Sequence, residues 1–242
     1  MKAHDYLMNA DIPAADVVEE LRLLVYGQLA RHGRVDAADD LGAVLHLSAR
    51  QVANGLRTLH TTRDLVLDDS GGIVLAHPYA TRNFGFSVMG ATTMWWGGCA
   101  WDAFAIAHLV PDEPDTLVAT RCAHCRKPHA WNVTRSAPPQ GNQVVHFATP
   151  MAQIWDDVAH ACQHQRIYCS HHCVDRHLAA HRAVDNGVRF DLTTLWKLAQ
   201  HWYTGRLDRG YRRRDPTTAS SYFAELGLTG PFWASSATSP SM

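Results

Sequence analysis

The chain has 242 residues, 46% hydrophobic and 19% charged, a composition typical of a globular protein with one large or two small domains and unlike that of a disordered chain. Lysine and arginine total 22 against 23 aspartate and glutamate, so the net charge of -1 creates no positive field that would attract nucleic acid or anionic lipid. Apolar runs are too short for a membrane span and the N-terminus is too acidic for a signal peptide, so we expect a cytoplasmic protein with no membrane partner.

The N-terminal third predicts a winged helix-turn-helix. Helical spacing of apolar residues predicts one helix over Asp16–His32 and a second over Ala37–Leu45, and Ser48 is a suitable N-cap for a third. A polar turn at 68–72 between two β-forming runs predicts a hairpin that would be the wing. We therefore expect a winged helix-turn-helix domain in residues 1–80.

Charge argues against DNA binding by this domain. The third helix offers few cations, Arg50 and Arg57 among them, whereas Asp68 and Asp69 at the tip of the wing would repel phosphate. Nucleic acid is therefore not an expected partner.

The remainder of the chain predicts an α+β core. Four β-forming runs are bounded by glycine, proline or polar turns: residues 84–88, 117–121, 130–134 and 144–148. Five segments have helical composition: residues 100–109, 150–163, 170–184, 192–204 and 217–226. We expect small antiparallel sheets and helices, ending in C-terminal helices, over 81–233, and a flexible tail at 234–242.

Six cysteines carry most of the chemical information: Cys99, Cys122, Cys125, Cys162, Cys169 and Cys173. In the cytoplasm they would be free thiols, available for metal binding or nucleophilic chemistry. Cys162 lies on the apolar side of a predicted helix, so we expect it to be buried core and not part of a site.

Cys99 follows two glycines and opens a predicted helix. There the positive end of the helix dipole would lower the pKa of the thiol and favour the thiolate. Asp102 returns to the same face one turn later and could exchange a proton with the thiol. Cys169 also stands at a predicted helix start, and two such thiolates facing one another would bind a soft cation such as mercury.

This pattern resembles the alkylmercury lyase (organomercurial lyase) family. Gly98–Asp102 is similar to the family's Cys-Ala-x-Asp, Arg121-Cys122 to its next cysteine position, and Tyr168-Cys169 to its aromatic-Cys. Order and approximate spacing hold over about residues 15 to 182.

The resemblance implies a detoxifying lyase, divergent within the family, with a lyase-like core after the winged helix. Cys99 and Cys169 would be the catalytic thiols and Asp102 the proton-handling carboxylate, with all three as mercury ligands. Protonolysis of the carbon-mercury bond would give a hydrocarbon and Hg(II) without an organic cofactor. Bound Hg(II) would pass to external thiols or to a mercuric-ion reductase.

A second interpretation competes for Cys169. The pair Cys122-Ala-His-Cys125 departs from the family motif, and with Cys169 and Cys173 it supplies the four thiols of a structural zinc site. If zinc held Cys169, the proposed mercury pair would be lost. The alternatives are then a zinc- or mercury-binding winged-helix regulator, or a lyase scaffold with other chemistry.

Four tryptophans and one run of arginines also lead to expectations about the core and the surface. Trp95, Trp96, Trp101 and Trp155 could line an apolar chamber for the organic group. The run Arg212–Arg214 predicts a solvated charged segment without a partner.

Overall fold

The structure is a computed structural model that describes residues 13–183 and 186–234. Apart from its first residue, the tail expected at 234–242 lies outside the described residues. Among the described helices, none combines the length and the apolar character needed to cross a bilayer.

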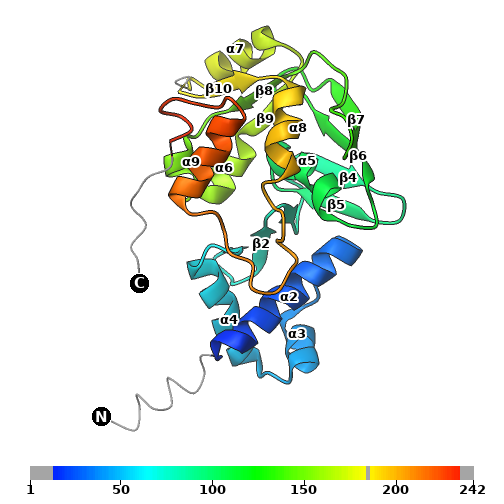
Figure 1. The fold of residues 1–242 in the computed structure, drawn as a ribbon, viewed down its shortest axis with the longest axis vertical. Coiled ribbons are helices and arrows are strands. Elements are labelled where there is room, and N and C mark those ends of the chain that lie inside the picture. Colours follow the sequence, from blue (N-terminus) through cyan, green and yellow to red (C-terminus); the bar gives the residue numbers. More distant parts are fainter. Residues whose placement is uncertain (1–12, 184–185, 235–242) are drawn as a thin grey trace.

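Three helices form the N-terminal unit, at the bottom of Figure 1: α2 (Ala15–His32), α3 (Ala38–Leu45) and α4 (Ala49–Thr61). Ser48 caps α4 as expected, in a reciprocal capping box with Gln51. Helix α2 ends at Gly33, whose φ of 66° suits glycine, and a Cβ there would lie 2.0 Å from the Met94 carbonyl oxygen.

A seven-stranded antiparallel sheet joins this unit to the rest of the molecule, in the order β1-β2-β3-β5-β4-β6-β7. Its strands are β1 (Val66–Leu67), β2 (Ile73–Ala76), β3 (Tyr79–Ala80), β4 (Phe86–Met89), β5 (Met94–Gly97), β6 (Asp115–Arg121) and β7 (Pro128–Thr134). The expected hairpin is thus β1 and β2. Because β2 pairs with β3 and β3 with β5, one sheet runs across the domain boundary expected at residue 80.

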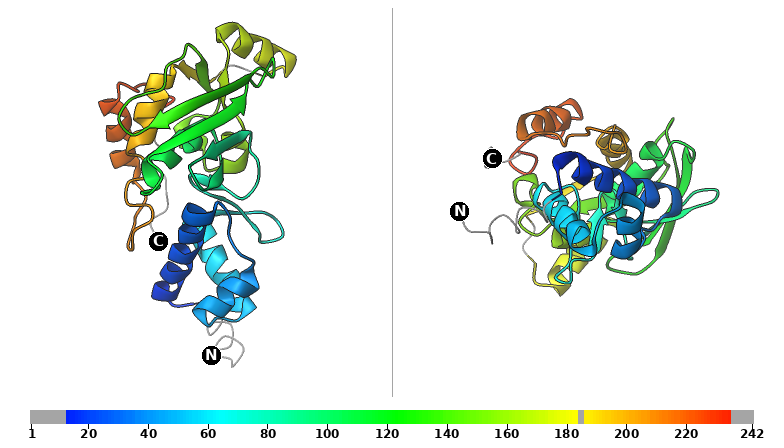
Figure 2. Two further views of the ribbon diagram at one scale, coloured as in Figure 1. Left: turned by 90° about the vertical axis from the view of Figure 1, so that its right-hand side faces the viewer. Right: turned by 90° about the horizontal axis from the view of Figure 1, so that it is seen from below.

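Helix α5 (Ala100–Leu109) lies at the centre of the core, and eight of its residues are buried. It packs on the sheet and on α8 (Leu192–Gln200). A second sheet has the order β10-β8-β9, with strands β8 (Val144–Phe147), β9 (Gln165–Tyr168) and β10 (Val188–Phe190). Around it lie the short helices η1 (Met151–Gln153), α6 (Val158–Gln163), α7 (His171–Ala180) and α9 (Pro216–Glu225). Figure 2 shows the long strands of the large sheet on the side facing away from α8 and α9.

The α+β class is confirmed, while several element boundaries differ from the prediction. The helix expected over 150–163 is divided into η1 and α6, because Asp157 turns out of helical geometry and caps α6. The helix expected over 170–184 ends at Ala180. Strand β5, which carries Trp95 and Trp96, was not predicted as a strand.

Candidate functional site

The turn from β5 into α5 places Cys99 and Asp102 together. Cys99 is the N-cap of α5, and its Sγ accepts a hydrogen bond from the Asp102 backbone N–H at 3.4 Å. The preceding glycines are required by space: a Cβ at Gly98 would lie 2.5 Å from Asp102 Oδ2, and one at Gly97 would lie 2.8 Å from Ala103 Cα. This local packing explains why two glycines precede the cysteine.

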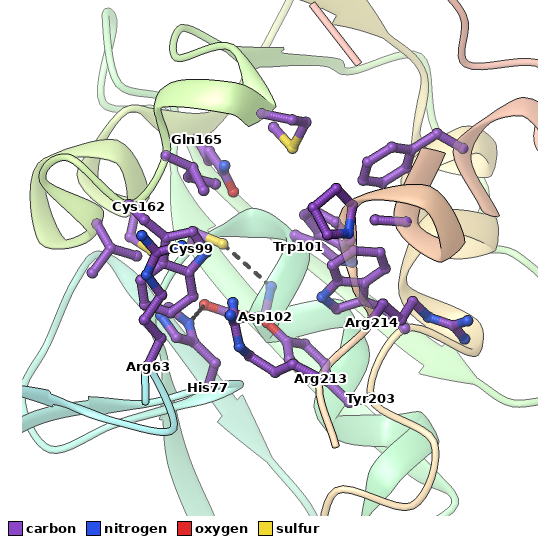
Figure 3. Close-up of a pocket in the computed structure, with 18 of the residues that line it drawn as sticks. Arg63, His77, Cys99, Trp101, Asp102, Cys162, Gln165, Tyr203, Arg213 and Arg214 are labelled. Atoms are coloured by element: carbon purple, nitrogen blue, oxygen red, sulfur yellow. Dashed lines mark hydrogen bonds and ion pairs between the residues drawn. The ribbon is translucent and has the colours of Figure 1, made fainter. Parts of the chain in front are cut away.

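A cavity of about 520 Å³ opens at this turn. Figure 3 shows Cys99, Asp102 and Cys162 on its wall, with His77 and Tyr203 beside the carboxylate. These side chains come from the end of α6 and from the segments after β2, β5 and α8, so distant parts of the chain converge here.

The second thiol of this cavity is Cys162, not Cys169. Cys99 and Cys162 lie close enough for each thiol to affect the pKa of the other, and one ligand atom from each of Cys162, Asp102 and His77 lies within 4.8 Å of the other two. Cys169, the expected partner of Cys99, does not line this cavity. Cys162 is buried, as its apolar helix face predicted, but the core it faces contains the cavity, so burial did not exclude a place in the site.

Both oxygens of the buried Asp102 carboxylate have partners. Oδ2 lies 2.9 Å from His77 Nδ1, and Oδ1 accepts a hydrogen bond from the Tyr203 hydroxyl at 2.6 Å. An ionised carboxylate accepts only, so His77 Nδ1 then carries the proton. His77 Nε2 is buried and has no hydrogen-bond partner among the described residues. Two fixed partners hold the carboxylate beside the thiols.

Burial raises the pKa of Cys99 well above its usual value, and Cys162 and the charge of Asp102 act in the same direction. This corrects the expectation that the helix start lowers the pKa. For Cys162, the hydrogen bond with Cys99 lowers the pKa, but burial and the charge of Asp102 leave it raised. Burial and Asp102 also raise the pKa of Tyr203. At neutral pH these three groups therefore retain their protons.

The remaining walls combine apolar and cationic groups. Trp101 and Trp155 line the cavity as expected, whereas Trp95 is committed to the core, where its Nε1 donates to the Leu29 carbonyl at 2.9 Å. Trp96 is also not among the lining residues. The guanidinium carbons of Arg63 and Arg213 lie 5.5 Å and 4.8 Å from the centre of the Trp155 ring.

Arg212 and Arg213 are exposed, as expected of a solvated run, but Arg213 and Arg214 also line the cavity, so the expectation that this segment has no partner is corrected. They lie in the segment between α8 and α9, and the charge pattern alone did not reveal where this segment folds.

Buried Arg206 fixes the N-terminal helices to the loop that carries Tyr203. Its Nε donates to the Tyr26 hydroxyl at 3.0 Å, and its guanidinium also donates to the Asp64 carbonyl at 2.6 Å. An ion pair with the Asp64 carboxylate at 3.5 Å balances its charge. Arg22 of α2 donates to the Arg206 carbonyl at 2.9 Å. The N-terminal unit is thus part of the support of the cavity.

A second thiol cluster lies outside the cavity. The Sγ atoms of Cys122, Cys125, Cys169 and Cys173 all lie within 4.8 Å of one another, and these residues do not line the cavity. Cys169 therefore lies in this second thiol cluster and not on the wall of the cavity.

Among the cavity residues that were not predicted are Cys162, His77, Tyr203 and Gln165. The sequence contained only a weak signal for Cys162, a cysteine on the inner face of a helix. His77, Tyr203 and Gln165 stand in segments without a motif, and only the folded chain brings them to Asp102 and Cys99.

Comparison with known proteins gives a consistent picture. The family model described as "MerB: Alkylmercury lyase" matches residues 80–204, just over half of the chain. A solved structure entitled "Crystal structure of the mercury-bound form of MerB2" is similar with a TM-score of 0.59 and 16% sequence identity, over 84% of this chain and 96% of that one. No curated protein matches the sequence.

Proposed function

Because the chain belongs to the alkylmercury lyase family, we propose that it cleaves the carbon-mercury bond of organomercurials by protonolysis, with Cys99, Cys162 and Asp102 as the reacting groups. One observation carries this assignment: two buried thiols and a buried carboxylate meet on the wall of a single cavity. Thiolates are the ligands that a soft metal such as mercury prefers.

The first step is exchange of the ligand on mercury. A substrate R–Hg–X, in which X is a thiolate of the solution, gives R–Hg–S(Cys99), and the Cys99 proton leaves with X as HX. The raised pKa of Cys99 makes free thiolate scarce at neutral pH, so formation of the mercury-sulfur bond drives loss of the proton.

In the second step the Cys162 thiol gives its proton to the Asp102 carboxylate, and its sulfur adds to mercury. Mercury then carries the organic group and two sulfur ligands, which weakens the carbon-mercury bond. Asp102 next delivers the proton to the carbon, the bonding pair forms the new C–H bond, and RH departs. The sum is R–Hg–X plus two thiols giving RH, HX and Hg(II) held by Cys99 and Cys162, with Asp102 ionised again.

His77 and Tyr203 act as positioning residues in this scheme. Their hydrogen bonds of 2.9 and 2.6 Å hold the two oxygens of Asp102 and stabilise its ionised form. A carboxylate stabilised in this way is the better leaving base when the proton passes to carbon.

The walls suggest which organic groups are accepted. Trp101, Trp155 and Phe223 provide apolar surface for an alkyl or aryl group. Arg63 and Arg213, on Trp155, add positive charge where a carboxylate of the organic group or of the thiol carrier could bind. External thiols or a mercuric-ion reductase would then accept the Hg(II).

We assign the expected winged helix-turn-helix to the support of this cavity and not to DNA. The observation that favours support is the buried Arg206, which ties α2 and the segment after α4 to the Tyr203 loop. A tight, salt-dependent complex with an operator, released by Hg(II) or Zn(II), would instead favour the metal-sensing regulator.

The test is hydrocarbon release from methylmercury in the presence of excess thiol. Wild-type protein is expected to release methane over many turnovers, and Cys99→Ser and Asp102→Ala are expected to release none above the buffer rate. Full activity in either variant, both verified as folded by circular dichroism, would overturn the assignment of reacting groups.

A further inference from the structure

We infer that Cys122, Cys125, Cys169 and Cys173 form a structural zinc site that fastens the turn between β6 and β7 to the start of α7. Their four Sγ atoms lie within 4.8 Å of one another, and Cys125 Sγ is 3.4 Å from Cys169 Sγ. Zinc-sulfur bonds of ~2.3 Å at tetrahedral angles place sulfurs roughly 3.8 Å apart, so little movement is needed to receive the ion.

The backbone around the first pair is already folded into a tight turn. Cys122 N–H donates to the Lys127 carbonyl at 2.9 Å, and Arg126 N–H donates to the Cys122 carbonyl at 3.0 Å. Arg126 has a φ of 63°, which closes the turn in the left-handed region.

The second pair uses the start of a helix. Cys169 directly follows β9, Ser170 caps α7, and Cys173 lies in the first turn of that helix. Both cysteines therefore lie at the N-terminus of α7. His129 Nε2 lies 3.3 Å from Cys169 Sγ and its ring stacks on Trp131, so with its proton on Nε2 it would donate a hydrogen bond to a metal-bound thiolate there.

The apolar core around the four cysteines is small, so a metal ion would add to its stability. This core is a cluster separate from the main one, with the buried residues Cys122, Val144, Tyr168, Cys173 and Val174. Five buried residues, two of them cysteines, leave little apolar surface to hold α7 in place. An ion bound to both cysteine pairs would join the turn between β6 and β7 to the start of α7.

Chemistry selects zinc over other outcomes. Four thiolates in tetrahedral arrangement are typical of zinc or of iron. A site that joins two segments outside the cavity needs an ion without redox chemistry, which favours zinc. The 3.4 Å separation of Cys125 and Cys169 also exceeds the ~2.05 Å of a disulfide, so the thiols are free to bind.

The inference does not depend on the lyase proposal, because none of the four cysteines lines the cavity. It also removes the conflict over Cys169, since Cys162 supplies the second thiol of the mercury site. Failure of one proposal would leave the other standing.

The experiment is elemental analysis of the full chain purified without added metal or mercury. We expect one zinc per chain, retained in Cys99→Ser and Cys162→Ser and lost in Cys125→Ser and Cys173→Ser. Cobalt(II) exchanged into the wild type should give the sulfur-to-metal and d–d absorption of tetrahedral thiolate, and chelation should lower Tm until zinc is restored.

Metal-free wild-type protein in which all six cysteines react as free thiols without unfolding would overturn the inference. So would stoichiometric iron, or disulfides among the four cysteines detected by intact mass after alkylation. Because the wild-type measurement decides these outcomes, it does not require that every variant folds.

Discussion

Replacement of Tyr203 by phenylalanine tests whether the partners of Asp102 serve the proton transfer. The variant removes the 2.6 Å hydrogen bond to Oδ1 and leaves the 2.9 Å contact of Oδ2 with His77. A hydrogen bond to a charged group contributes about 1.5–3 kcal/mol, which corresponds to roughly 10- to 100-fold in rate. Because the bond stabilises the carboxylate formed as the proton leaves, we expect kcat to fall by this factor with little change in KM.

The assay is methane release at saturating methylmercury and thiol, with Tm measured on the same preparation. Tyr79→Phe is the control, because it removes the hydroxyl of a buried tyrosine that does not line the cavity and has no hydrogen-bond partner among the described residues. Its removal should leave kcat unchanged. Equal kcat in both variants and in the wild type would refute the role of Tyr203.

Four further changes test other parts of the account. Cys162→Ser should reduce methane release by roughly 1,000-fold or more, because a hydroxyl is a poor ligand for mercury. An active Cys162→Ser variant would contradict the assignment of Cys162 as the second thiol. Arg206→Met should lower the free energy of unfolding, measured in urea, by about 3 kcal/mol because a buried ion-pair partner is lost, whereas the exposed Arg209→Met should cost below about 1 kcal/mol. Burial lowers the pKa of His108 from 6.5 to about 4, so the folded state resists protonation of this side chain. The free energy of unfolding should therefore fall by roughly 2 kcal/mol as the pH drops from 6.5 to 4. Urea unfolding measured over this pH range should show a smaller fall in His108→Leu. Arg213→Ala should raise KM several-fold for a carboxylate-bearing arylmercurial and not for methylmercury; equal effects on both would argue against carboxylate binding.

Local signals in the sequence predicted much of the fold. The capping residue Ser48 and the helical spacing of apolar residues located α4, and composition located α5 at its observed bounds, 100–109. These features depend on neighbouring residues, so they can be read without the tertiary structure. Strand β5 was not predicted because its Trp95 packs against α2, which lies far away in the chain.

The sequence predicted two of the residues proposed to react, Cys99 and Asp102, but not the third, Cys162. Cys99 and Asp102 share one helical turn, and their proximity followed from spacing alone. The partner thiol could not be found in this way, since Cys162 and Cys169 both lie near β9 and only the direction of the chain decides which faces Cys99. The pKa of Cys99 was expected in the wrong direction, because desolvation in a buried cavity outweighs the helix dipole.

The most direct test of the central claim is a single turnover in D₂O with one equivalent of methylmercury and no external thiol, followed by mapping of the bound metal by peptide mass spectrometry. The account predicts one equivalent of CH₃D and Hg(II) bridging the peptides of Cys99 and Cys162, with neither thiol open to alkylation. Methylmercury retained intact on the protein, or Hg(II) found on Cys169 with Cys162 still free, would contradict it.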